Sequence, residues 1–140
     1  MKFYFIFTKK GLAVILAFII LALVILVLFS SVNHSFYDGS THQKRMEYLA
    51  PIKVLENAFF VKETRLPEKI EGALLSYNEI VKTAGFDLEN FCGKPIVIYS
   101  YKLLNSNAEI VNLFICDGKI ISADITNNLK GTINPIIKEK

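Results

Sequence analysis

The cysteines and histidines carry the most reactive chemistry in this sequence, and they are few. Cys92 stands in a Phe-Cys-Gly stretch, and Cys116 precedes an Asp-Gly pair. A cysteine nucleophile needs a neighbouring histidine or cation to form its thiolate. The only histidines, His34 and His42, lie far from both cysteines along the chain. The spacing therefore favours two unpaired thiols at small turn or core sites.

Two alternative roles for the cysteines stay open. In an exported domain, Cys92 and Cys116 could form a disulfide. Their expected positions differ by more than about 15 Å along the strand direction, whereas disulfide-bonded Cα atoms lie within about 7 Å. Either cysteine could also be the nucleophile of a thiol-dependent or hydrolytic enzyme of the cell envelope, the alternative to a binding function.

Metal and cofactor chemistry finds no support in the pattern of ligating residues. His34 and His42 have no carboxylates clustered beside them, whereas zinc and calcium sites use denser ligand spacing. A glycine-rich phosphate loop and a serine-centred catalytic motif are both absent from the sequence. The sequence predicts neither a metal nor a cofactor.

A row of polar side chains is the best candidate for a binding surface. Lys102, Asn112, Ser122 and Asp124 occupy even positions in three successive β-forming runs. Because alternate residues of a strand share one face, the four could converge on one side of a sheet. The competing interpretation is an ordinary solvated face, which antiparallel sheets often have.

The elements that would position this row are three strands and a helix. Runs 96–104, 109–116 and 119–126 have apolar odd positions, which predicts an antiparallel meander whose odd face is the core. For odd-numbered residues of the second and third runs to lie opposite each other, the turn between them must be a three-residue bulged turn, 116–118. This turn places Leu113 opposite Ile121. An apolar stripe at three- and four-residue steps predicts a helix over about 68–84, ended by Gly85 and packed across the odd face.

Two earlier elements complete the predicted domain. A capping box at Ser40 and Gln43 begins a helix that Pro51 limits, and run 58–66 is a strand. The fold class is therefore α+β: a single N-terminal transmembrane helix, then a small domain with an amphipathic helix on a three-stranded meander plus one earlier strand.

The N-terminal segment predicts the membrane helix. Residues 11–29 are nineteen uncharged, mostly apolar residues, and as a helix they would be roughly 28 Å long, close to the bilayer core. Lys2, Lys9 and Lys10 precede the span, which favours a cytoplasmic N-terminus. The predicted organisation is a cytoplasmic tail (1–10), the transmembrane helix (11–29), a linker (30–40) and an exported domain (41–137). A cleaved signal peptide is the alternative, but the following Ser30 and Ser31 provide a poor cleavage site.

Charge excludes one class of partner. Apart from the three lysines before the span, 13 basic and 13 acidic side chains balance. A neutral domain has no electrostatic attraction for nucleic acid, so none is expected as a partner. The expected partners are the membrane and another envelope protein or ligand. Contact within the membrane is also open, since Ala13 and Ala17 form one small-xxx-small pair.

A family resemblance covers most of residues 44–135. It rests on the stretches RMEYL, VKETRLPEKI, YNEIVKTAGFDL, YSYKLLN and NLFICDGKIISADI, with Gly93-Lys94 and Gly131. In these the chain resembles an uncharacterised family of small membrane-anchored proteins of Gram-positive bacteria, domain-of-unknown-function family 4830. The resemblance implies an exported single domain behind an N-terminal anchor. It implies no reaction and no catalytic residues.

These observations predict a single-pass cell-membrane protein with an extracytoplasmic C-terminal domain. The absence of a catalytic constellation in the sequence favours a non-catalytic binding or interaction module at the cell envelope. Lys102, Asn112, Ser122 and Asp124 are its candidate binding residues.

Overall fold

The computed structural model describes residues 18–22 and 36–137. The chain divides into two compact units, Met1–Ser35 and Phe36–Lys140. In the first unit, residues 18–22 are helical. The predicted tail 1–10, the remainder of the predicted span 11–29, and residues 30–35 of the linker lie outside the described residues. Within the described ranges, no helix combines the length and apolar character needed to cross a bilayer.

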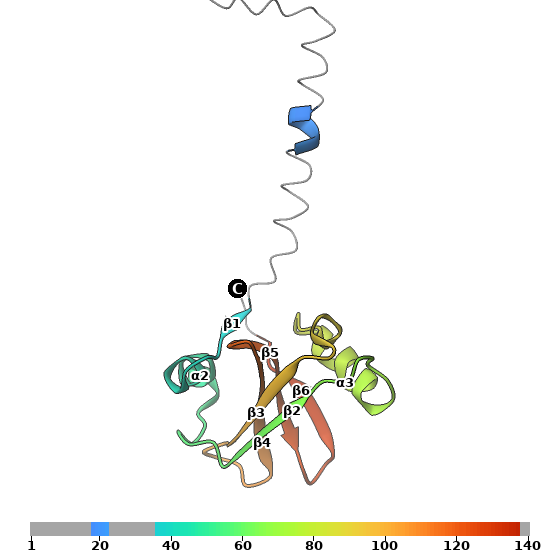
Figure 1. The fold of residues 1–140 in the computed structure, drawn as a ribbon. Helices are drawn as coiled ribbons and strands as arrows, with labels where there is room; N and C mark the ends of the chain where they lie inside the picture. Colours follow the sequence, from blue (N-terminus) through green and yellow to red (C-terminus); the bar gives the residue numbers. More distant parts are fainter. Residues whose placement is uncertain (1–17, 23–35, 138–140) are drawn as a thin grey trace, which may run out of the picture. The chain divides into compact units, whose positions relative to one another are not determined.

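The second unit is a small α+β domain built on one antiparallel sheet, as the sequence predicts. Its strands follow the order β1-β5-β4-β3-β2, and β6 also pairs with β5 (Figure 1). The strands are β1 (Tyr37–Asp38), β2 (Phe60–Arg65), β3 (Pro95–Lys102), β4 (Glu109–Cys116), β5 (Lys119–Asn127) and β6 (Thr132–Pro135). The predicted meander and the earlier strand are confirmed, while β1 and β6 are short strands that the sequence does not predict.

The helices are shorter than the sequence predicts. Helix α2 spans His42–Leu49, and the side chain of Thr41, not Ser40, caps it by accepting from the Lys44 N–H at 3.2 Å. Helix α3 spans Ala73–Lys82 rather than 68–84, because Gly72 adopts a left-handed φ of 58° just before it. Short 3-10 helices, η1 (Ala50–Ile52) and η2 (Leu88–Phe91), complete the helical content.

The end of α3 follows the predicted pattern. Gly85 is left-handed, with φ at 86°, and the Phe86 N–H returns to the Val81 carbonyl at 3.2 Å. Phe86 is consequently buried against the domain core. A glycine in this position lets the chain reverse without a Cβ clash.

A helix lies on each face of the sheet. The prediction that the amphipathic helix packs on the odd face is wrong. Helix α2 lies on the odd face, where Arg45 donates to the Tyr101 hydroxyl at 3.1 Å and stacks over the Tyr99 ring at 3.9 Å. Helix α3 lies on the even face, where Tyr77 packs on Phe114. Figure 1 shows the two helices on opposite sides of the sheet.

The even face takes a helix because it too has apolar side chains. Ile96, Cys116 and Ile121 are buried there together with Leu88 and Phe91 of η2. An amphipathic helix buries its apolar stripe against whichever face provides apolar area. The buried apolar residues therefore form two clusters: one includes Tyr48 and Leu49 of α2 together with Val81 of α3, and the other includes Leu88 and Phe91 of η2.

The β4–β5 hairpin also differs from the prediction. Ile115 pairs with Ile120 and Cys116 with Lys119, which leaves a two-residue turn, Asp117-Gly118, with both φ values positive (49° and 74°). Such a turn matches the right-handed twist of the strands. The extra residue lies inside β5 instead, where the register shifts and Leu113 pairs with Ala123, not Ile121. Odd positions thus still face odd positions beyond the shift.

Residues 36–40, the described part of the predicted linker, belong to the folded domain. Strand β1 pairs with the start of β5, and the Gly39 N–H donates to the Gly118 carbonyl at 2.9 Å. The Arg45 guanidinium in turn donates to the Gly39 carbonyl at 3.0 Å. The domain therefore begins near residue 36 and not at 41.

Gly39 is expected to tolerate no side chain. An alanine Cβ would lie 2.5 Å from Cδ1 of Ile115 and 2.7 Å from Cγ1 of Ile120. Gly39→Ala should lower the free energy of unfolding by about 1–3 kcal/mol through overpacking. The measurement is chemical denaturation of the full chain in detergent micelles.

A compensating change tests the cause of that loss. Ile115→Val removes the Cδ1 atom, so the double variant should be less destabilised than the sum of the single variants. Additive losses would mean that Gly39 is required for another reason.

Candidate functional site

Polar side chains on the even face of β3, β4 and β5 form a connected hydrogen-bond network. The Ser100 hydroxyl of β3 donates to Asn112 of β4 at 2.8 Å. The Asn112 amide donates to Oδ1 of Asp124 on β5 at 3.0 Å and to the Thr126 hydroxyl at 3.3 Å. Thr126 donates to the same Asp124 oxygen at 2.8 Å. Directly opposed positions on three strands create this row, because Ser100 pairs with Asn112 and Asn112 with Asp124.

Tyr77 of α3 joins the helix to this network. Its hydroxyl donates to Oδ2 of Asp124 at 2.7 Å and lies 2.8 Å from the Ser122 hydroxyl oxygen. Its ring stacks on Phe114 with a centroid separation of 5.5 Å. The helix is thus joined to β5 by a polar contact at the centre of an apolar interface.

The carboxylate at the centre is buried without a cation. Asp124 is 1% exposed and Ser122 is fully buried. Among residues 36–137, Asp124 makes hydrogen bonds but takes part in no ion pair. Burial, and then the Asp124 charge, raise the pKa of Tyr77 far above its ordinary value, so its phenol stays protonated and donates. A buried carboxylate is tolerated where donors satisfy its oxygens.

The four predicted binding residues do not form one accessible surface. Asn112, Ser122 and Asp124 come together, but Ser122 and Asp124 are buried where Tyr77 of α3 contacts them. Lys102 is exposed, sits opposite Ile110 rather than in the network, and places its Nζ 5.3 Å from the centroid of the Phe59 ring. The arrangement fastens α3 to the sheet and leaves Asn112 as the only half-exposed member of the three.

Tyr77 was missed as a site residue because it occupies the apolar stripe of its helix. Its spacing at three and four residues from Leu74 and Val81 is that of a core position. One signal was present: Tyr77 is the single residue of that stripe with a hydroxyl, and a buried tyrosine hydroxyl usually has a partner.

The cysteines take turn and core positions. Cys92 ends η2 and is half-buried, whereas Cys116 is 1% exposed at the end of β4, and both are free thiols. Burial, followed by the nearby Asp117 charge, raises the pKa of Cys116, which opposes formation of the reactive thiolate. His42 lies in α2, and His34 is outside the described residues. In the part of the chain that the structure describes, three or more potential metal ligands nowhere gather.

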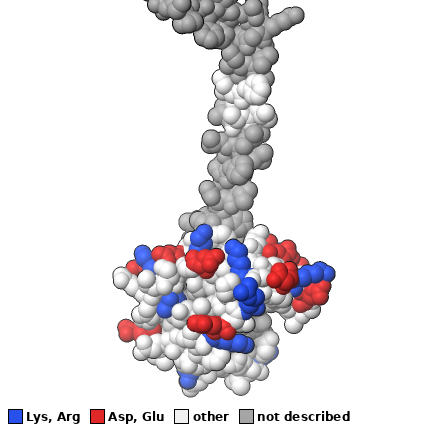
Figure 2. Space-filling view, viewed as in Figure 1, with Lys and Arg blue, Asp and Glu red and all other residues white. Residues whose placement is uncertain are grey.

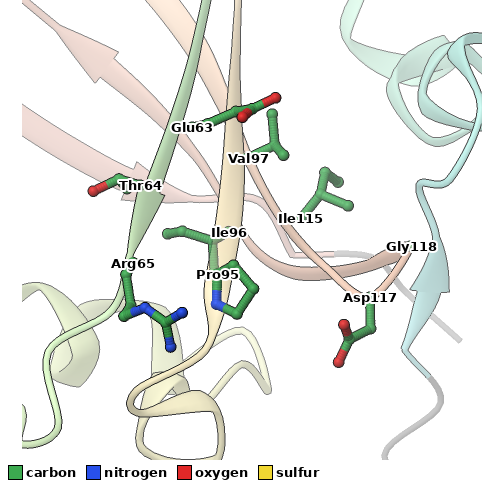
Figure 3. Close-up of a pocket in the computed structure, with 9 residues that line it drawn as sticks. All are labelled: Glu63, Thr64, Arg65, Pro95, Ile96, Val97, Ile115, Asp117 and Gly118. Atoms are coloured by element: carbon green, nitrogen blue, oxygen red, sulfur yellow. The ribbon is translucent and has the colours of Figure 1, made fainter.

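A pocket lies at the end of the odd face that holds the β4–β5 turn. Its volume is about 540 Å³, and its lining comes from β2, β3, the end of β4 and the turn (Figure 3). The lining residues are Glu63, Thr64, Arg65, Pro95, Ile96, Val97, Ile115, Asp117 and Gly118. Val97 and Ile115 supply apolar surface, and the charges stand at the borders.

The charged residues at the pocket differ in the ion pairs and hydrogen bonds that they already make. Asp117 pairs with Lys94 at 3.8 Å, and Arg65 donates to the Gly93 carbonyl. Glu63 makes no hydrogen bond or ion pair with any residue in the ranges described. Figure 3 shows Glu63 on the same side of β2 as Val97, with Thr64 directed to the opposite side. The pocket can thus accept an apolar group accompanied by a positive charge.

Strand β2 forms the outer edge of the sheet beside this pocket. All six of its residues are exposed, and Phe60 and Val61 are 50% and 52% exposed. The sequence contained a signal for this position, because Lys62, Glu63 and Arg65 give the strand the charged character of an edge. Its outer backbone groups are open to a partner.

Comparisons of the chain with protein-family models, curated proteins and solved structures each returned no match. The resemblance to domain-of-unknown-function family 4830 accordingly stays a prediction.

Removing the Tyr77 hydroxyl should weaken the domain. Tyr77→Phe keeps the ring on Phe114 but takes a donor from the buried Asp124 and a hydrogen-bond partner from Ser122. We expect a loss of about 1–3 kcal/mol in the free energy of unfolding, measured by denaturation of the full chain in detergent micelles.

Tyr99→Phe is the matched control. The Tyr99 hydroxyl makes no hydrogen bond within residues 36–137, so the same chemical change should alter stability by less than about 0.5 kcal/mol. Equal losses in the two variants would show that the Asp124 network contributes nothing particular.

Proposed function

We propose that this protein is a single-pass cell-membrane protein whose extracytoplasmic α+β domain is a non-catalytic interaction module. The uncharged segment 11–29 supplies the anchor, and the three preceding lysines favour a cytoplasmic N-terminus. The resemblance to the Gram-positive membrane-anchored family 4830 supports the same arrangement. The module would contact another envelope protein or ligand.

The exposed edge strand β2 is the observation that carries the interaction function. A six-residue edge with exposed side chains offers a row of backbone donors and acceptors to an added strand. Exposed apolar side chains extend this surface into the preceding loop, where Phe59 is 49% and Leu55 46% exposed. The pocket beside β2 provides a place for a side chain of the partner.

Surface charge is consistent with a protein or small-ligand partner. Lysine and arginine alternate with aspartate and glutamate over the face seen in Figure 2, so this face has no extended field of one sign. The alternative of a thiol-dependent or hydrolytic enzyme is disfavoured at Cys116, since its thiol is buried with a raised pKa.

Contact through β2 is testable by photocrosslinking in living cells. A photoreactive amino acid at Val61 of the full chain should give a crosslinked adduct, because this side chain lies on the exposed edge. Leu75 of α3, an apolar side chain that is 40% exposed, is the matched control and should give little adduct. Equal yields at both positions, or none at Val61, would remove β2 from consideration.

The same cells test the membrane topology. Leu129 is 86% exposed between β5 and β6, so Leu129→Cys in a Cys92→Ser background should react with a membrane-impermeant maleimide on intact cells. Labelling only after lysis would contradict the extracytoplasmic location.

A further inference from the structure

The outer edge of β2 presents a defined set of backbone groups. The Leu66 N–H donates to the Lys94 carbonyl at 3.0 Å, toward β3. Because alternate residues of an antiparallel strand direct their backbone groups to the same neighbour, Thr64 and Lys62 also face β3. The N–H and C=O groups of Val61, Glu63 and Arg65 therefore face outward. Pro95 opposite Arg65 agrees with this assignment, since a proline can donate nothing to that position.

The side chains of the same strand are arranged for pairing with an identical strand. Glu63 and Arg65 lie two residues apart, so they share one face. When two identical edges pair antiparallel about a two-fold axis perpendicular to the sheet, residues on one face oppose residues on the same face. A pair centred on Thr64 then sets Glu63 of each copy opposite Arg65 of the other.

The geometry points to a second copy of this chain as the partner of β2, joined edge to edge with Thr64 on the two-fold axis. This inference rests on the proposed function in taking β2 as the contact surface. The two outward-facing pairs, Glu63 with Arg65 of the second copy and the reverse, exchange backbone hydrogen bonds. The same two pairs bring opposite charges together across the strands, an arrangement that stabilises antiparallel pairing.

Other registers of the same pairing lack this match. Centring on Lys62 opposes two lysines, and centring on Glu63 opposes two glutamates, both of which are unfavourable. Centring on Val61 places Glu63 opposite Phe59 and provides no counter-charge. Thr64 is the centre at which the charges of β2 are self-complementary.

Both charged side chains are available for the pairing. Glu63 has no other ion pair or hydrogen bond in the described residues. Arg65 uses Nη1 for the Gly93 carbonyl, and a guanidinium has five N–H donors, so others remain for a carboxylate. The charges at the border of the pocket thus gain partners in the dimer.

Charge reversal tests the register through self-association of the full chain in detergent micelles, followed by sedimentation. Glu63→Arg and Arg65→Glu should each weaken the dimer by at least about tenfold, because each converts two attractive pairs into repulsive ones. The double variant, Glu63→Arg with Arg65→Glu, restores opposite charges and should dimerise again. Lys62→Glu is the control on the other face, opposite Leu66, and should change little.

Disulfide trapping on membranes tests the position of the axis. In a Cys92→Ser background, Thr64→Cys should give a disulfide-linked dimer, since facing residues at such a pair lie about 4.5 Å apart between Cα atoms. Lys62→Cys should not, because the two copies of residue 62 would be about 13 Å apart. Crosslinking of Lys62→Cys and not Thr64→Cys would overturn the proposed register.

The outcomes separate this inference from the proposed function. A monomer in sedimentation with no Thr64→Cys disulfide, together with a Val61 photoadduct containing a different protein, would overturn the dimer and leave the interaction module in place. Single charge-reversal variants that both stay fully dimeric would also overturn it, as would a double variant that fails to restore the association lost in the single variants.

Discussion

One extra residue in β5 determines how the two faces of the sheet are used. The two-residue turn at Asp117-Gly118 sets Ile115 opposite Ile120, so without a bulge even positions of β5 would share a face with odd positions of β4. Asp124 would then point into the apolar core beneath α2. The register shift lets Ile120 and Ile121 bury on opposite faces, in the two separate clusters, and returns Asp124 to the face of Asn112. The polar network and the surface on which α3 packs both follow from this register shift.

The network in turn decides which surface remains for other molecules. Asp124 accepts from β4, from its own strand and from α3, which satisfies the buried charge and fixes the helix over β5. The centre of the even face is consequently interior. Helix α2 occupies the odd face through Arg45, and the edge strand β2, with the pocket beside it, stays exposed.

Anchoring and edge pairing would reinforce each other. A strand-edge contact between small domains buries little area and is weak when both partners diffuse freely. Tethering through segment 11–29 would confine the domains to a layer at the membrane surface and raise their effective concentration. The charges along β2 also protect the edge, because they disfavour registers other than the self-complementary one.

The sequence by itself determined the α+β class, strands β2 to β5, the glycine end of α3 and the balanced charge, because strand alternation, helical periodicity and left-handed glycines are local properties. It also brought Asn112, Ser122 and Asp124 to one face. It did not determine the turn at Asp117-Gly118, the faces taken by α2 and α3, the partners of Tyr77, or the short strands β1 and β6. Each of these depends on contacts between residues distant in the chain. A bulge can reverse strand parity, and a sheet with apolar side chains on both faces can seat a helix on either, so only the packed structure decided them.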